Sequence, residues 1–236
     1  MQIGQKITKK LSSVVQKKYS QSSDNYWLRG SIELIPGIGG TLDTWFFQFA
    51  DKEKQRRIES AINDLSSKLD LVVEKVDVKY IEKNIEEYAY LFEKFLRYVS
   101  MEYQEKMRKA FVNLMGNFST VTYSKKQNKD VYFSKLSEIS PDHLVMLKTA
   151  YDYSHIKTKP DFEKTKTVKE YLTLEFKKRG LDEAIILGLF IDLQSKGLMN
   201  EVFHNTFGGG SYSYHVTALG ETILNLIKDN DSSKQT

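Results

Sequence analysis

One apolar stretch, interrupted by proline and glycine, limits what this chain can fold into. Residues 31–50 read SIELIPGIGGTLDTWFFQFA, and no other part of the sequence combines so many apolar residues with so much backbone freedom. Pro36 ends or kinks a helix that starts near Leu34, and the glycines after it permit positive φ angles and close backbone approach. The stretch therefore predicts two short apolar helices around a tight bend, a hairpin that must bury its surface.

Two environments can bury this hairpin. It can form the central helix pair of a soluble bundle, in which its glycines allow close packing. It can also switch from the bundle to a membrane, because its aromatic residues bury a large apolar area in either place. On this second hypothesis the hairpin residues that contact a membrane or a partner are Pro36, Gly37, Gly39, Gly40, Trp45, Phe46 and Phe47. Glu33 and Asp43 interrupt the stretch, which is too polar for the roughly 20 apolar residues of a spanning helix, so we expect no constitutive transmembrane helix.

The first twenty residues carry five lysines and no acid, although the formal net charge of the whole chain is only +4. Residues 21–236 therefore sum to −1. The apolar residues of this segment recur at helical spacing, which predicts a basic amphipathic helix. It is either a surface helix docked on the bundle with solvated lysines, or a contact for anionic lipid or an acidic partner. The lysines that would make such a contact are Lys6, Lys9, Lys10 and Lys17.

Length and cysteine content set further bounds. A chain of 236 residues, 40% of them hydrophobic, can bury one large core or two modest ones, and we predict two. The absence of cysteine excludes disulfides and thiolate chemistry, and the first apolar positions do not join into a secretory signal. We therefore expect a cytoplasmic protein, which on the membrane hypothesis associates with a membrane when it is activated.

The first half of the sequence shows helical periodicity. A seam of apolar residues steps by four and three from Ile58 to Val72, as in a helical bundle. We predict a second helix from Ile81 to Val99 and a third from Met107 to Phe118, whose aromatic and methionine stripes we assign to packing. The periodicity is lost at residues 119–129. We place a helical bundle at residues 1–125, including the N-terminal helix and the apolar hairpin.

The second half predicts helices, a hairpin and a last helix. Ser140 and Pro141 start one helix, and Val168–Arg179 and Leu181–Lys196 form two more that join at Gly180. Two short strands, 199–205 and 211–216, flank Gly208–Gly210, and Thr217 caps the final helix. This order is similar to that of a winged helix-turn-helix domain. The fold prediction is a mainly α protein with an N-terminal helical bundle, a winged-helix domain with a small β-hairpin at residues 126–229, and a disordered tail at 230–236.

A winged helix suggests DNA binding, but the helix that would enter the major groove is a poor reader of bases. Asp182 and Glu183 stand at its start, Asp192 lies further along, and its only basic residue is Lys196 at the far end. Residues 140–236 carry twelve basic and thirteen acidic side chains, so their net charge is −1. The residues that could contact phosphate groups lie just before this helix, at Lys177, Lys178 and Arg179. We therefore favour protein contacts over DNA binding.

No catalytic motif stands out. His204 and His215 would lie near each other on the paired strands, but no third ligand is apparent, so we favour a structural pairing over a metal site. The glycines at 37–40 and 208–210 lack the strand-to-helix context of a phosphate-binding loop. We predict a non-enzyme with no cofactor, no metal and no small-molecule substrate.

Four short blocks carry a family resemblance. They are Glu33–Gly40 followed by a basic helix around Arg56 and Arg57, Phe92–Arg97, Met107–Met115 and Phe133–Asp142. In this succession the chain resembles bacterial helical proteins of the abortive-infection alpha type, over roughly residues 30–150. The resemblance implies a role in bacterial defence against phage and offers no enzymatic site to transfer.

Three functions remain open at this point. The first is a non-enzymatic anti-phage defence protein that acts through protein–protein contacts, as a homo-oligomer or with a partner, and through membrane contacts. The second is a DNA-binding transcriptional regulator whose bundle is a sensor or dimerisation domain. The third is a scaffold that only assembles partners.

Overall fold

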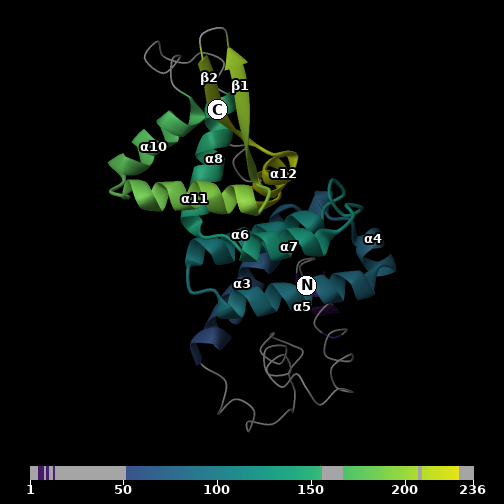
Figure 1. Ribbon diagram of the computed structural model, residues 1–236. Helices are drawn as coiled ribbons and strands as arrows, with labels where there is room; N and C mark the ends of the chain where they lie inside the picture. Colours follow the sequence, from purple (N-terminus) through teal and green to yellow (C-terminus); the bar gives the residue numbers. More distant parts are fainter. Residues whose placement is uncertain are drawn as a thin grey trace. The chain divides into compact units, whose positions relative to one another are not determined.

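The structure is a computed structural model that describes residues 5–7, 9–10, 13, 52–155, 167–206 and 209–228 (Figure 1). The chain divides into two compact units, Met1–Ser137 with Leu226–Thr236, and Glu138–Asn225. The described residues are mainly helical, with one two-stranded antiparallel sheet, which confirms the mainly α prediction. The boundary that we predicted after residue 125 falls within the first unit, which also contains helix α7. The apolar hairpin of residues 31–50 and the tail of residues 230–236 lie outside the described residues.

Helix α3 (Lys52–Leu71) supplies the first seam of the bundle. The predicted stripe of Ile58, Ile62, Leu65 and Leu69 is buried, and Val72 is buried just beyond the end of the helix. Lys68 is also buried, because its aliphatic stem passes the site where Gly116 of α6 lacks a side chain; a Cβ there would lie 2.7 Å from Lys68 Cδ. Glycine therefore permits the close approach of α3 and α6.

The second predicted helix is two helices in the structure. After the 3-10 turn η2 (Val73–Lys75), α4 (Val78–Lys83) ends at Asn84 and α5 (Ile85–Met101) follows at once. Asn84 has φ −116° and ψ 38°, and its Nδ2 donates to Tyr80 O at 2.8 Å. The Asn84 N–H keeps its helical bond to the same carbonyl at 3.0 Å, so the interruption lies in the non-helical backbone of Asn84, which periodicity alone does not predict. The apolar face is otherwise as predicted, with Tyr88 through Val99 buried at each expected position.

Aromatic packing joins α5 to α6 (Glu105–Phe118) and α7 (Lys129–Ser137). The ring of Phe111 lies between those of Tyr98 and Phe133, with centroid distances of 5.3 and 6.3 Å. The buried hydroxyl of Tyr88 donates to Phe118 O at 2.6 Å, and burial raises the pKa of this phenol. These contacts confirm that the aromatic stripes are core.

The last two residues of helix α12 (Ala218–Ile227) belong to the first unit. Asn113 Nδ2 donates to Ile227 O at 2.9 Å, and Asn117 Nδ2 donates to Leu226 O at 2.7 Å. Two asparagines of α6 therefore satisfy carbonyls that the helix end leaves without intrahelical partners.

The second unit begins with α8 (Pro141–His155), which starts where the sequence predicts. Ser140 N–H donates to His143 Nδ1 at 3.1 Å, and the Ser140 hydroxyl lies 2.7 Å from the same nitrogen. Histidine here takes the place that glutamate has in a capping box. The buried residues of α8 are Met146, Leu147, Ala150 and Tyr153, together with His143.

Helices α10 (Val168–Lys178) and α11 (Glu183–Ser195) follow, with the predicted glycines at their ends. Gly180 has φ 83° and Gly197 has φ 71°, the left-handed conformation that glycine adopts without a Cβ penalty. Leu181 N–H donates to Phe176 O at 3.2 Å, and Leu198 N–H donates to Leu193 O at 2.9 Å. Both helices therefore end in the glycine-dependent turn that the sequence indicates.

Strands β1 (Met199–Thr206) and β2 (Gly209–Val216) form an antiparallel pair, with Met199 opposite Val216 and Thr206 opposite Gly209 (Figure 1). Strand β2 packs on α8 and α10, and the rings of Phe190 and Tyr214 lie 4.7 Å apart. Thr217 caps α12, because its hydroxyl accepts from Gly220 N–H at 3.1 Å. Within the residues described, no helix is both long and apolar enough to cross a bilayer.

Candidate functional site

Helix α11 is apolar on two faces. Ile186, Leu189, Phe190 and Leu193 point into the core of the second unit. The other face carries three apolar residues that are about half exposed: Ile185 (52%), Leu187 (45%) and Ile191 (56%). A surface helix normally presents polar residues on that side. The exposed apolar face of α11, defined by Ile185, Leu187, Gly188 and Ile191, is therefore a candidate interaction surface.

Gly188 lies in the middle of this face. A Cβ added at this glycine would meet nothing within 4 Å, and its φ angle lies outside the left-handed range. The fold of the second unit therefore has no steric need for glycine here. Glycine inside a helix costs about 1 kcal/mol relative to alanine, but it allows another backbone to approach closely.

The three predicted phosphate contacts lie where α10 ends. Lys177 Nζ is 2.6 Å from Glu183 Oε2, and Lys178 Nζ is 2.6 Å from Glu175 Oε1. The hydrogen bond from Lys177 lowers the pKa of Glu183. The guanidinium of Arg179 lies 5.3 Å from the centre of the Phe176 ring. These cations thus have partners within the second unit, and carboxylates oppose two of them.

Asp192 lies at the C-terminal end of the α11 face, between a histidine and a lysine. Its Oδ2 is 3.3 Å from His143 Nε2 and 3.3 Å from Lys196 Nζ. The contact between Asp192 and His143 lacks hydrogen-bond geometry and is electrostatic. Burial lowers the pKa of His143, and the negative charge of Asp192 opposes that effect. Because Nδ1 accepts from Ser140 N–H, the neutral ring carries its proton on Nε2, which faces Asp192.

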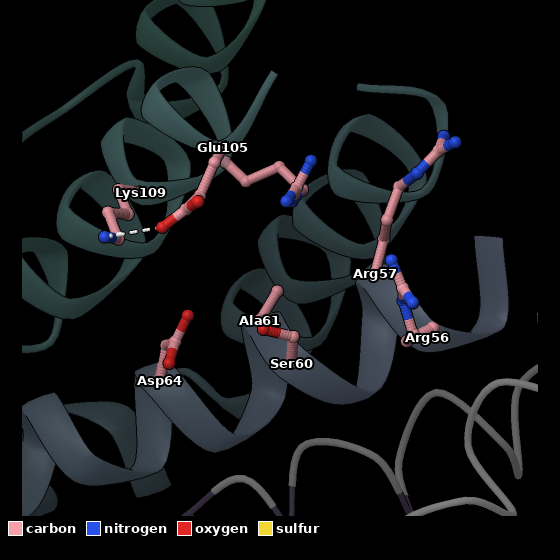
Figure 2. A pocket seen from close by; sticks show the side chains of 8 residues that line it. Arg56, Arg57, Ser60, Ala61, Asp64, Glu105 and Lys109 are labelled. Carbon is pink, nitrogen blue, oxygen red and sulfur yellow. Dashed lines mark ion pairs between the residues drawn. The ribbon is translucent and has the colours of Figure 1, made fainter. Parts of the chain in front are cut away.

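A second candidate is a charged pocket of about 390 Å³ between α3 and α6 in the first unit. Its lining residues are Arg56, Arg57, Ser60, Ala61, Asp64, Glu105, Arg108 and Lys109, which give four positive and two negative charges. Figure 2 shows Asp64, Glu105 and Lys109 on one side of the pocket and Arg56 and Arg57 on the other. The pocket is therefore positive overall, with its acids gathered at one end.

Two of the pocket arginines are held by backbone carbonyls. Arg57 Nη1 donates to Ser100 O at 3.0 Å, and Arg108 Nη1 donates to Tyr103 O at 2.7 Å and to Glu102 O at 3.2 Å. At the acidic end, Lys109 Nζ is 2.7 Å from Glu105 Oε1, which lowers the pKa of Glu105. Desolvation raises the pKa of Asp64, against the lowering effect of Lys109.

The sequence predicted another surface, at the N-terminal lysines and the apolar hairpin. The backbone is helical at Lys6, Lys9 and Lys10. Ile7 is buried, and Lys10 Nζ lies 2.8 Å from Glu82 Oε1. These are the contacts of a helix docked on the bundle. Lys17 and the hairpin residues lie outside the described residues, so a switch to a membrane stays a prediction.

The predicted proximity of His204 and His215 is wrong. In the hairpin His204 pairs with Ser211, whereas His215 pairs with Asn200 at the other end of the strands. Strand bounds alone do not fix the register, and the observed register places the two histidines at opposite ends of the hairpin. Among the described residues, no three acidic or histidine side chains are grouped as metal ligands.

The sequence predicted neither candidate site, although Arg56 and Arg57 of the pocket stand in one of the blocks that carry the family resemblance. The α11 face had a readable signal, because residues 184–191 are apolar or glycine at every position, and a single helix cannot bury all of them on one side. The pocket had none. Arg57 and Arg108 lie in different helices far apart in sequence, and no spacing rule brings them together.

No protein-family model, curated protein or solved structure matches this chain.

Proposed function

We propose that this chain is a non-enzymatic bacterial defence protein of the abortive-infection kind, and that its second unit is a winged-helix-like module that binds protein through α11. The observation that carries the proposal is the exposed apolar face of α11, with Ile185 and Ile191 each more than half exposed. In a winged helix this is the helix that would face DNA. Exposed isoleucines there suit a protein surface, because the core of a protein interface is apolar and poor in charge.

The charges around α11 also favour protein over DNA. Asp182, Glu183 and Asp192 are exposed on this helix and would repel phosphate. Lys177 and Lys178, which could attract phosphate, already lie 2.6 Å from carboxylates. The rival function, a DNA-binding regulator, therefore has the element order of the second unit in its favour but not its charge.

The partner that we propose for the α11 face is a second copy of this chain. Ile185 and Ile191 lie three residues before and after Gly188. If two α11 helices cross antiparallel at Gly188, Ile185 of each packs against Ile191 of the other, and the glycines let the backbones approach. The acidic start of one helix then lies near the C-terminal end of the other, which suits the two helix dipoles.

The oligomeric state tests this partner. Sedimentation velocity of the full chain over a concentration series should show a monomer–dimer equilibrium. Ile191→Ser should shift it at least tenfold towards monomer, because it removes a large apolar contact at each end of the pair. Leu174→Ser is the matched control, since Leu174 is a comparably exposed residue (41%) on α10. A wild-type protein that stays monomeric at all concentrations, or equal effects of the two variants, would contradict the dimer.

Gel-shift titration at low salt tests the DNA-binding rival. We expect no complex with duplex DNA at micromolar protein. Appreciable, salt-dependent affinity that disappears when Lys177, Lys178 and Arg179 are replaced by glutamate would overturn the protein-binding proposal in favour of the regulator.

Phage challenge tests the defence role itself. Bacteria that express the wild-type chain should show reduced phage plating, and cells that express Ile191→Ser should lose that protection at equal protein level. Leu174→Ser should retain it. If the wild-type chain protects against no phage of a broad panel, the defence proposal fails, whatever the oligomeric state.

A further inference from the structure

The charged pocket between α3 and α6 is independent of the α11 face and has the features of an anion site. We propose that it binds a small phosphomonoester whose other end carries hydrogen-bond donors, in the size class of a nucleoside monophosphate. The volume of about 390 Å³ lies within the range of roughly 300–1,000 Å³ typical of ligand pockets. Its net charge of +2 matches a phosphomonoester, which carries about −1.5 to −2 at neutral pH.

The positive charge of the pocket exceeds the negative charge of its two carboxylates, although both carboxylates lie within electrostatic range of Arg108. Arg57 and Arg108 each donate to backbone carbonyls, and neither has an ion pair among the residues that the structure describes. A guanidinium has five N–H donors in a planar fork, and these contacts use one nitrogen of each arginine. The carbonyls therefore fix the two side chains while leaving donors and positive charge for a ligand. Phosphate oxygens match that fork in bidentate geometry.

A purely structural role explains only part of this arrangement. Arg57 and Arg108 bind carbonyls at and just beyond the end of α5, where cations stabilise a helix. Arg56 has no such role. Its side chain is 78% exposed and lies 3.3 Å from Glu53 in an exposed pair, which contributes little to stability. Arg56 also lines the pocket, so it can leave this pair and close over a bound phosphate.

The acidic end defines the rest of the ligand. Asp64 and Glu105 lie together across the pocket from Arg56 and Arg57 (Figure 2). Glu105 is paired with Lys109 at 2.7 Å, while desolvation raises the pKa of Asp64. Asp64 lines this end of the pocket, where its carboxylate can accept a hydrogen bond from a ligand donor such as an amino or hydroxyl group. Inorganic phosphate should thus bind the pocket more weakly than a phosphomonoester that also reaches Asp64.

Isothermal titration of the full chain at low salt tests this site with three probes, namely AMP, inorganic phosphate and adenosine. We expect AMP to bind more tightly than phosphate, and adenosine not to bind detectably. Arg56→Gln and Arg108→Gln should each weaken AMP about tenfold or more, as expected for a charged hydrogen bond. Arg97→Gln, at an exposed arginine of α5 outside the pocket, should leave the affinity unchanged.

Asp64→Asn distinguishes the contribution of the phosphate group to binding from that of the rest of the ligand. It removes a negative charge from the pocket, so inorganic phosphate should bind severalfold more tightly, while the advantage of AMP over phosphate should shrink. Thermal melts of every variant show whether it is folded. Because Arg56 and Asp64 are exposed, Arg56→Gln and Asp64→Asn keep the test decisive even if Arg108→Gln unfolds.

A membrane lipid is the other source of a phosphomonoester. Flotation with vesicles of phosphatidylcholine, with and without phosphatidic acid, separates this source from a soluble ligand. We expect that Arg56→Gln does not change how much protein floats with either kind of vesicle. Binding to phosphatidic acid that Arg56→Gln abolishes, without AMP binding, would overturn the soluble ligand. Failure of both AMP and phosphate to bind at millimolar concentration, or equal losses in Arg56→Gln and Arg97→Gln, would overturn the site, and neither result bears on the α11 face.

Discussion

The ammonium of Lys129 lies 2.9 Å from the carboxylate of Glu87, and it joins the first turn of α7 to α5. The Lys129 side chain is only 1% exposed, whereas that of Glu87 is 41% exposed. The ring centres of Tyr80 and Tyr88 lie 5.5 and 5.3 Å from the ammonium. One half-exposed carboxylate and two aromatic faces therefore compensate a buried positive charge.

This geometry predicts unequal effects of removing the two partners. Glu87→Gln leaves the lysine buried without its counter-charge and should destabilise the protein by about 2 kcal/mol, below the 3–5 kcal/mol of a fully buried pair because Glu87 is partly solvated. Lys129→Met keeps the volume, leaves Glu87 in water and should cost less than about 1 kcal/mol. Urea denaturation of both variants gives the comparison. If Lys129→Met loses more stability than Glu87→Gln, the positive charge of Lys129 stabilises the protein by more than its burial costs, which would contradict this prediction.

The regular parts of the fold were predictable because each depends on neighbours in sequence. Apolar spacing from Ile58 to Val72 fixes the buried face of α3, and Gly180 and Gly197 mark helix ends because few other residues adopt positive φ. The break at Asn84 was not predictable from spacing. The backbone of Asn84 leaves the helical conformation and its side chain adds a second hydrogen bond to Tyr80 O, while the apolar pattern continues unchanged across this position.

Of the two candidate sites, one has a signal in the sequence and the other does not. The outward apolar face of α11 follows from an unbroken apolar run, which any helical placement must partly expose. The pocket requires that α3 and α6 pack with their arginines on the same side, and that carbonyls at and just beyond the end of α5 hold two of them. Such an arrangement depends on tertiary packing and leaves no periodic signal in the sequence.

The burial of His143 predicts a pH dependence of stability. Its pKa in the folded state is below the ordinary value of 6.5, chiefly because burial disfavours the charged ring. Asp192 and Asp142 act in the opposite direction, and Lys196 adds to the lowering. At a pH between the pKa values of the folded and the unfolded state, the unfolded chain binds more protons than the folded protein. The contribution of His143 to the free energy of unfolding is therefore complete above about pH 6.5 and is lost as the pH falls through the folded-state pKa.

Denaturation at several pH values between 5 and 8 measures this effect. The free energy of unfolding should fall more steeply below pH 6.5 in the wild type than in His143→Gln, which has no titrating ring at that position. Parallel curves for the two proteins would show that another group causes the acid sensitivity.

The start of α10 predicts the effect of removing a cap. Thr167 Oγ1 accepts from Glu170 N–H at 3.2 Å, and the Glu170 carboxylate accepts from Thr167 N–H at 2.8 Å, a complete capping box. Thr167→Ala should destabilise the second unit by about 1 kcal/mol. Ser195→Ala, which removes an exposed hydroxyl from the end of α11, should change stability by less than about 0.5 kcal/mol. Equal effects in thermal melts would mean that the box does not stabilise the helix.

Two helical glycines of the second unit should respond oppositely to alanine. At Gly188 a new Cβ meets nothing within 4 Å and φ lies outside the left-handed range, so Gly188→Ala should stabilise the monomer by about 0.5–1 kcal/mol through helix propensity. At Gly220 the new Cβ would overlap the backbone carbonyl of Leu198 and lie 2.9 Å from Val216 Cγ1, so Gly220→Ala should destabilise by about 1–3 kcal/mol. Urea denaturation at low protein concentration measures both effects. At higher concentration Gly188→Ala should also weaken the proposed dimer, because the added methyl separates the crossing helices; a stabilised variant that dimerises as well as the wild type would exclude a crossing at Gly188.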